Sequence, residues 1–279
     1  MAIELASRFS PFVDELFSTE SRKSTLTNSN FDWTGAHSIK VYDVSTSDMN
    51  DYQRNGPTQE GQWSRYGVIQ ELSATTQEMT LRKDRSFTFE IDTLDEDETK
   101  QALQASTALA RQLRNVAIPE QDEWVYLQMC ENAGHKPAAT GLTATNIYDK
   151  IVSANTELDN AEVPETDRVL VATPDTYLLL KKCRDIVLET NIGNELRLRG
   201  VISILDGMNV LKIPANRLPA DFGFMIAHPV ATVAPTKLAS YKIHIDPPGI
   251  SGSLVEGRLN YDAFVLKNKA VAIYYQAKT

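Results

Sequence analysis

Hydrophobic and polar residues alternate with different periods along this chain. In "RSFTFEID", Phe87, Phe89 and Ile91 alternate with more polar residues, and "HSIKVYDVS" alternates in the same way around Ile39 and Val41. Successive side chains of a strand point to opposite faces, so a period of two predicts half-buried strands. A long polar stretch centred on "RNGPTQEG" separates the two segments. We predict an extended β-hairpin loop over residues 31–93.

This predicted hairpin needs a covering surface, because an isolated hairpin is marginally stable in water. Another part of the chain, or another chain, must cover its apolar face. The N-terminus has a similar need. Phe9, Phe12 and Leu16 lie at helical spacing, and the polar run "STESRKSTLTNSN" follows them. A short amphipathic helix on a polar tether has little core of its own, so residues 1–30 predict an arm that lies against something else.

A long helix is predicted after the hairpin, in the segment "DEDETKQALQASTALARQLRNV". Acidic residues at its start and arginines at its end complement the helix macrodipole, and apolar residues recur every three or four positions. The helix is expected from about Asp95 to Val116, a length of about 30 Å. Pro119 favours an extended Ile118 and suits the first turn of a new helix. We therefore predict a joint at Pro119 between two helices, within residues 94–135.

Residues 136–228 alternate between helical and strand patterns. "TATNIYDKIVSANTELDNA" and "DTYLLLKKCRDIVLE" read as helices, whereas "RVLVAT" and "DFGFMIAHP" read as strands, and "DGMN" reads as a turn between two further strands. This alternation predicts a separate unit in which helices flank a small sheet. Residues 229–279 return to strands, in segments such as "SYKIHID" and "EGRLNYDAFVL". The whole chain is predicted to be α+β.

Composition and charge narrow the function. The net charge is -9, so tight non-specific binding to a phosphate backbone is not expected. The two cysteines, Cys130 and Cys183, are far apart without metal-type spacing, which favours buried reduced thiols over a disulfide. The N-terminus has no secretory signal, and no apolar run approaches the length of about 18 residues that spans a membrane. We expect a soluble protein made in the cytosol.

No motif in the sequence nominates a catalytic centre. The four histidines show no H-x-x-x-H spacing and no pairing with cysteine, so a zinc site has little support. "DTLDEDE" could bind a divalent ion, but acids at a helix start explain it without one. "GISGSLVEG" lacks the spacing of a phosphate-binding loop, and no G-x-S-x-G appears. We predict no catalytic, cofactor or metal residues, so the unusual features of the sequence are features of shape.

Several segments, in their order along the chain, resemble the major capsid proteins of tailed bacteriophages, which have the Hong Kong 97-type fold. "FSTESRK", "QELSATTQEMTLRKDRSFTFEID" and "DEDETKQALQASTALARQLRNVAIPEQDEW" resemble the first half of those coat proteins, and "FMIAHPVATVAPTKL" and "EGRLNYDAFVLKNKAVAIYY" resemble their closing segment. The resemblance implies an N-terminal arm (1–30), an extended β-hairpin loop (31–93), a long spine helix with the first part of a peripheral domain (94–135), an inserted axial domain (136–228) and the second part of the peripheral domain (229–279).

The resemblance also implies partners. Identical copies would form pentamers and hexamers of an icosahedral head, assembled in the host cytoplasm and present in the virion. The head would enclose double-stranded DNA without sequence-specific binding, and scaffolding, portal and head-completion proteins would take part. Residues expected at contacts between subunits are Phe9, Phe12, Leu16, Phe87, Phe89 and Ile91. Because Met1 lies close to the arm, scaffolding is expected from another protein or from self-assembly alone.

Two alternatives remain open from the sequence. One keeps the fold and changes the biology: an encapsulin-type nanocompartment shell that encloses an enzyme. Small uniform particles with protein cargo and no nucleic acid would favour it. The other is a soluble cytosolic α/β enzyme with a cleft in residues 136–228, which a stable monomer with a deep polar pocket would support.

Overall fold

The computed structural model describes residues 20–31, 33, 38–56, 63–98, 104–183 and 204–278. Contacts between residues divide the chain into two compact units. The loop unit comprises Gly35–Thr80, and the body comprises Met1–Thr34 with Leu81–Thr279. Among the described residues, the loop unit holds one two-stranded sheet and the body holds three sheets.

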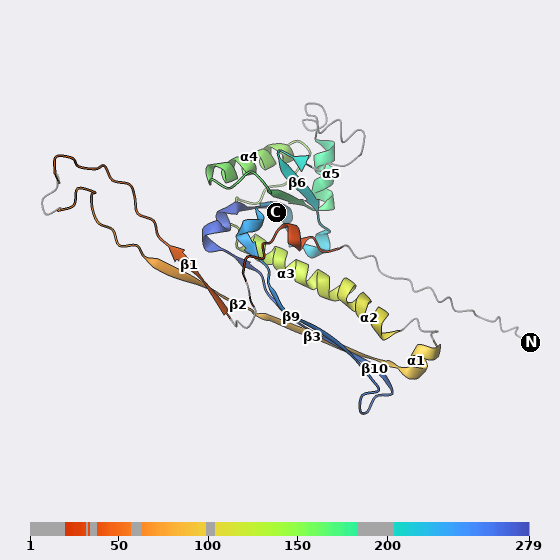
Figure 1. Cartoon of the computed structure of the whole chain (residues 1–279). Helices are drawn as coiled ribbons and strands as arrows, with labels where there is room; N and C mark the ends of the chain where they lie inside the picture. The colour runs from red at the N-terminus through yellow and green to blue at the C-terminus, as the bar shows by residue number, and fades with distance from the viewer. Residues whose placement is uncertain are drawn as a thin grey trace, which may run out of the picture. The chain divides into compact units, whose positions relative to one another are not determined.

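The loop unit is an antiparallel pair of strands, β1 (Ser38–Val44) and β2 (Ala74–Thr80), joined by a long connection (Figure 1). Sequence periodicity predicted β1 correctly and its partner wrongly. The expected partner, "RSFTFEID", belongs to the body, and the hairpin ends at Thr80 rather than near residue 93. β2 reads "ATTQEMT" and buries only Met79, so it has no apolar alternation to detect.

The body contains a long three-stranded antiparallel sheet in the order β3-β10-β9 (Figure 1). Its strands are β3 (Lys83–Asp92), β9 (Thr236–Ile245) and β10 (Gly252–Tyr261). β10 is central, and its Val255 pairs with Phe89 on one side and Ile243 on the other. β3, one of the two strands that periodicity marked, is therefore a neighbour of β10 and not the partner of β1.

Three helical segments follow β3, and Gln104, between the first and the second, is extended. They are α1 (Thr93–Glu98), α2 (Ala105–Gln112) and α3 (Ile118–Glu131), and a π-helical turn, η2 (Leu113–Ala117), joins the last two. Gln104 has φ -54° and ψ 132°, which is an extended conformation. The expected helix from Asp95 to Val116 is thus corrected: the continuous helix begins at Ala105 and runs about 40 Å to Glu131.

The joint at Pro119 has a different form from the one predicted. Ile118 has φ -66° and ψ -48°, so it is helical and the expectation of an extended residue is wrong. A proline ring within a helix clashes with the carbonyl four residues earlier and removes one hydrogen bond. Here the preceding turn is widened, because the N–H of Ile118 donates to the carbonyl of Leu113, five residues back. Figure 1 draws α2, η2 and α3 as one continuous helix.

The α/β part of the body has a five-stranded sheet in the order β12-β7-β4-β6-β5. Its elements are α4 (Ile147–Asn160), β4 (Val169–Ala172), α5 (Pro174–Lys182), β5 (Ile204–Leu205), β6 (Met208–Lys212), β7 (Phe222–Ala227) and β12 (Ile273–Ala277). The helix predicted over "TATNIYDKIVSANTELDNA" and the "DGMN" turn are confirmed, and Asp206 and Gly207 of that turn have positive φ angles of 48° and 76°. The helix predicted over "DTYLLLKKCRDIVLE" is confirmed as far as Lys182, where α5 ends because Cys183 is extended, and residues 184–189 lie outside the described residues. Residues 136–228 do not complete this sheet alone, because β12 from the C-terminus forms its edge beside β7.

Short elements connect the two larger sheets. β8 (Thr232–Val233) and β11 (Phe264–Val265) form a two-stranded sheet, and the 3-10 turns are η1 (Lys23–Thr25), η3 (Ala215–Arg217), η4 (Pro229–Ala231) and η5 (Lys267–Ala272). These elements bring the N-terminal segment, α3 and the strands after residue 228 together.

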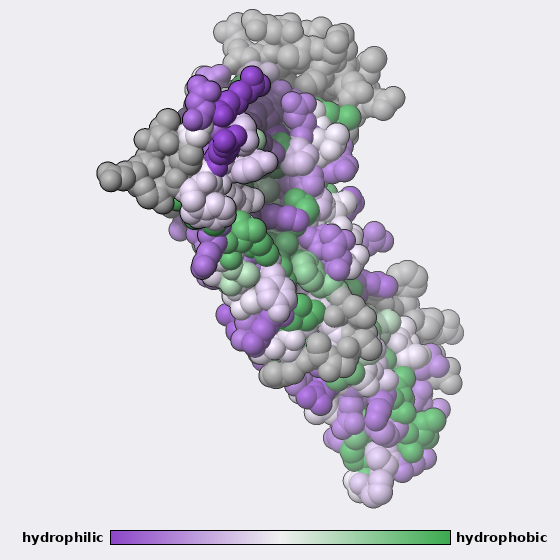
Figure 2. Space-filling view, turned by 60° about the vertical axis from the view of Figure 1, so that its left-hand side comes forward, coloured by the Kyte–Doolittle hydropathy of each residue, from purple (hydrophilic) through white to green (hydrophobic). Residues whose placement is uncertain are grey.

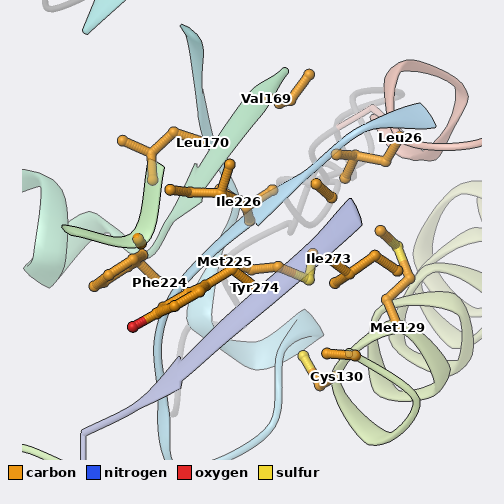
Figure 3. Packing of buried hydrophobic residues seen from close by; sticks show 14 of the residues in the cluster. Leu26, Met129, Cys130, Val169, Leu170, Phe224, Met225, Ile226, Ile273 and Tyr274 are labelled. Atoms are coloured by element: carbon orange, nitrogen blue, oxygen red, sulfur yellow. The ribbon is translucent and has the colours of Figure 1, made fainter. Parts of the chain in front are cut away.

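One hydrophobic core joins these parts of the body (Figure 3). Its labelled members come from α3, β4, β7, β12 and the N-terminal segment: Leu26, Met129, Cys130, Val169, Leu170, Phe224, Met225, Ile226, Ile273 and Tyr274. Cys130 and Cys183 are buried and are not joined by a disulfide, as predicted, and burial raises the pKa of the Cys130 thiol to about 12. Leu26 is fully buried, so residues 20–31 lie on their own chain. For those residues, the surface that the predicted arm lies against belongs to their own chain.

Candidate interaction surfaces

Apolar side chains reach the surface in several places among hydrophilic ones on the face shown in Figure 2. Half of the large hydrophobic residues that are exposed among the described ones belong to the short loop unit. They are Tyr42, Val44, Met49, Tyr52, Trp63, Tyr66, Val68, Ile69 and Leu72. Trp63 is 81% exposed and Tyr66 is 78% exposed. Such a density of exposed apolar groups is unusual for a protein that stays monomeric, and it marks a candidate interaction surface.

The described residues of the loop unit are joined by a two-stranded ladder and by contacts in the connection between its strands. β1 and β2 form its ladder, the N–H of Ser73 donates to the hydroxyl of Ser45 at 2.9 Å, and the N–H of Gln53 donates to the carbonyl of Arg65 at 3.0 Å. The rings of Tyr52 and Tyr66 meet edge to face at 5.0 Å. A two-stranded ribbon with this little burial is marginal alone. Its apolar side chains would gain most of their hydrophobic stabilisation from a second surface.

The residues predicted at subunit contacts on β3 lie on a face that the chain covers itself. Ile91 is buried and Phe87 and Phe89 are half-buried. They form a cluster with Val255 of β10 and with Ala105, Ala108 and Leu109 of α2. This removes the reason for assigning Phe87, Phe89 and Ile91 to a contact with another chain. Phe9, Phe12 and Leu16 lie outside the described residues.

The long sheet also carries a groove of about 510 Å³. Polar and charged side chains make up most of its lining, with Ser86, Thr88, Lys242, Glu256 and Arg258 among them. Arg258 is bonded to Asp84 at 2.9 and 2.5 Å, and this bond lowers the pKa of the Asp84 carboxyl. Glu256 lies 3.3 Å from His244. An ion pair thus occupies the Arg258 guanidinium and an imidazole lies beside the Glu256 carboxylate, an arrangement that suits a polar surface better than an acid–base centre.

A polar network fixes the start of β3 and the end of β10 to α3. The buried carboxylate of Asp262 accepts the indole N–H of Trp124 at 2.8 Å and, from Arg82, the backbone N–H at 2.9 Å and the Nε at 3.2 Å. The Nζ of Lys83 lies 3.8 Å from the centre of the Trp124 ring, a cation–π contact. Sequence reasoning singled out neither Trp124 nor Asp262. The polar residue Asp262 at the end of an apolar strand was the signal that it missed.

A second polar cluster surrounds Asp122, which also belongs to α3. Its carboxylate is fully buried and accepts hydrogen bonds from Arg217 of η3 at 2.8 Å and from Ser21 at 2.6 Å. Burial and the Asp122 charge both raise the pKa of the neighbouring Tyr126 hydroxyl. A buried carboxylate with a guanidinium partner needs no metal to be stable.

Neither a metal nor a membrane is indicated by the part of the chain that the structure describes. No group of three or more His, Cys, Asp or Glu residues in that part is placed to hold a metal ion. Every helix found there is too short or too polar to cross a bilayer.

No protein-family model and no curated protein matches this sequence. Solved structures do match, over nearly the whole chain. A chain of "Mycobacterium phage Che8" has a TM-score of 0.78 and 18% identity, covering 98% of this chain and 97% of that one. A chain of the capsid of cyanophage P-SCSP1u has a TM-score of 0.78 and 13% identity, covering 98% and 92%. A chain of the mature capsid of bacteriophage PhiM1 has a TM-score of 0.76 and 13% identity, covering 99% and 92%. The chain therefore shares its fold with phage capsid chains, which confirms the α+β fold class predicted from sequence.

Proposed function

We propose that this chain is the major capsid protein of a tailed bacteriophage, which self-assembles into pentamers and hexamers of an icosahedral head. One observation carries the proposal: the structural likeness to the cyanophage and PhiM1 capsid chains extends over 98% and 99% of this chain. A likeness of that extent includes the loop unit as well as the body, so it is more than a shared core motif.

The exposed apolar surface of the loop unit supports self-assembly. Each copy presents the same unsatisfied side chains, including Trp63, Tyr66 and Ile69. If the loop unit of one copy packs on a different surface of the next, the contact is heterologous, and repeated rotation closes a ring. Rings of five and six copies are the units that an icosahedral head requires. The polar groove and the carboxylates of Asp122 and Asp262 support a structural role in preference to catalysis.

The charge of the chain fits a container for DNA. With a net charge of -9, the protein has no large excess of cations to bind the phosphate backbone tightly. We propose that the head encloses double-stranded DNA without sequence-specific binding and is part of the virion. Assembly in the host cytoplasm, with scaffolding, portal and head-completion proteins, belongs to the same proposal.

Electron microscopy of the purified protein, at concentrations where subunits associate, tests the proposal. We expect closed icosahedral shells or free pentamers and hexamers. Small uniform shells that contain protein cargo and no nucleic acid after expression would instead favour a nanocompartment shell. A stable monomer in sedimentation analysis at every concentration would contradict both shell functions.

A further inference from the structure

The described N-terminal residues form a strap along the body, defined here as Glu20–Phe31 with Trp33. Its polar sequence, "ESRKSTLTNSNF", has one aliphatic residue, Leu26, and gives no periodic signal. The structure nevertheless separates inward from outward positions. Ser21, Lys23 and Asn28 are partly buried and Leu26 is fully buried, whereas Thr25 is among the exposed residues. The strap therefore packs against the body through these inward side chains.

The C-terminal part of the strap is held at β8 and β11. The backbone N–H of Asn28 donates to the carbonyl of Thr232 at 2.9 Å, and its side-chain amide donates to the carbonyls of Pro229 and Val230 at 3.2 and 3.0 Å. Trp33 stacks on Phe264 with a centroid distance of 5.6 Å. Together with Leu26 in the core, these contacts fix the later half of the strap independently of its beginning.

The beginning of the strap is held by a different chemistry, on α3. Ser21 donates its hydroxyl hydrogen to Asp122 at 2.6 Å, and the Nζ of Lys23 donates to the side-chain oxygen of Gln121 at 2.7 Å. Burial lowers the pKa of the Lys23 ammonium, while the charge of Asp122 acts in the opposite direction. Asp122 also keeps the guanidinium of Arg217, at 2.8 Å, as a partner of its own in the body.

Substitutions on the two sides of this contact should therefore have different effects on the stability of the body. Removing Asp122 would take a buried carboxylate partner away from the buried Arg217 guanidinium, a change that typically destabilises a protein strongly. Removing the side-chain groups of Ser21 and Lys23 would leave the Asp122–Arg217 pair intact. The body does not need these two strap groups to satisfy its own charges. Their contribution is to fix where the strap begins.

We propose that Asp122 is a positioning residue for assembly: by binding Ser21, with Gln121 binding Lys23, it fixes where the strap begins on α3 in each subunit. This inference rests on the proposed function, because a fixed starting point matters when identical copies must place the same segment in the same way. Equivalent placement in every copy is a condition of a closed symmetric shell.

The test compares the double variant Ser21→Ala/Lys23→Met with the control variant Thr25→Ala. Methionine keeps an unbranched apolar stem in the place of Lys23 without its charge. Thr25 belongs to the same strap, but its side chain bonds only the local carbonyl of Arg22 and is exposed. Spin labels at Glu20→Cys and Glu123→Cys, both exposed positions, report the distance between the strap's beginning and α3.

We expect a narrow distance distribution in the parent protein and in Thr25→Ala, and a broad one in the double variant. The melting temperature of the double variant should stay close to that of the parent, while its yield of closed shells falls at least several-fold. A narrow distribution in the double variant would overturn the proposal, as would a parental yield of shells despite a broad distribution. A further double variant, Ser21→Ala/Lys23→Arg, restores a cationic donor at position 23 and should narrow the distribution again. A distribution as broad as that of Ser21→Ala/Lys23→Met would count against the role of Gln121.

The two proposals fail in different ways. If the parent protein forms no shells, the proposed function fails, and the label distances still decide whether Asp122 fixes the strap. If the parent forms shells and the double variant forms them equally well, the function stands and the positioning role of Asp122 is lost.

Discussion

The body and the loop unit satisfy their hydrophobic residues in opposite ways. In the body, segments far apart in sequence share one core, from Leu26 through α3 to β12. In the loop unit, Trp63, Ile69 and Leu72 stay mainly exposed although they are as apolar as the core residues. The same physical requirement, removal of apolar surface from water, is met within the chain in one region and left open in the other. We interpret the body as the part that folds alone and the loop unit as the part that another copy completes.

The largest expected effect is on assembly. The double substitution Trp63→Asp/Ile69→Asp places two charges on the exposed surface of the loop unit. These charges cost little in a free subunit and much at a buried contact. We expect soluble, folded subunits that form no shells, as measured by sedimentation and electron microscopy. Shells of normal yield from this variant would show that the loop unit is not a contact surface.

The next comparison uses two leucines. Leu170→Ala removes a fully buried side chain of β4, and Leu72→Ala removes a side chain of the loop unit that is 61% exposed. Core truncations of this type cost about 2–5 kcal/mol, whereas exposed ones change stability by about 0.5 kcal/mol or less. Urea unfolding of unassembled subunits checks both. Equal losses would mean that the loop unit buries its apolar residues as the body does.

Loss of a polar contact should also cost more stability in the body than in the loop unit. We expect this difference to be smaller than the one between the two leucine variants. Asp262→Ala leaves the indole N–H of Trp124 and the backbone N–H of Arg82 without their buried acceptor, which we expect to cost about 2–4 kcal/mol. Ser73→Ala removes an exposed hydroxyl of the loop unit, and its expected cost is about 0.5 kcal/mol or less. The free energies of unfolding of the two variants decide the comparison. A loss for Ser73→Ala as large as that for Asp262→Ala would contradict it.

The smallest effect is a pH dependence confined to the body. Burial raises the pKa of Tyr275 to about 12, with lesser contributions from Cys130 and Asp221. An unfolded tyrosine ionises near pH 10, so the folded state binds more protons between about pH 10 and about pH 12, and stability falls as pH rises through that window. Tyr275→Phe should reduce this fall in urea unfolding midpoints. An unchanged alkaline fall would show that Tyr275 does not contribute to it.

Sequence reasoning found the elements that carry a local pattern. β1, β3, α4 and α5 all follow from periodicity or from caps within the segment, and the resemblance of the ordered segments to phage coat proteins gave the fold. Thr173 is an example, because its side chain accepts a hydrogen bond from the N–H of Thr176 at the start of α5. The residues that signal this helix start in the sequence are also the ones that form the contact.

The missed features depend on residues far apart. β2 has a polar sequence that is a strand only because β1 pairs with it, and β12 belongs to the five-stranded sheet only because β7 accepts it. The strap has one apolar residue, Leu26, whose burial requires α3 and the sheet to be in place. Pro119 predicted an interruption, but the widened turn before it keeps Ile118 helical. Contacts between distant parts of the chain decide these features, so the conformational preference of each local segment does not predict them.

The reactivity of a single thiol in the loop unit reports whether another copy covers this surface in assembled shells. Cys130 and Cys183 are buried, so Ile69→Cys supplies one accessible thiol at a position that is 64% exposed. Maleimide labelling is then timed in unassembled subunits and in purified shells. We expect rapid labelling of subunits and strong protection in shells, because another copy covers the loop unit. Equally rapid labelling of both would contradict this expectation.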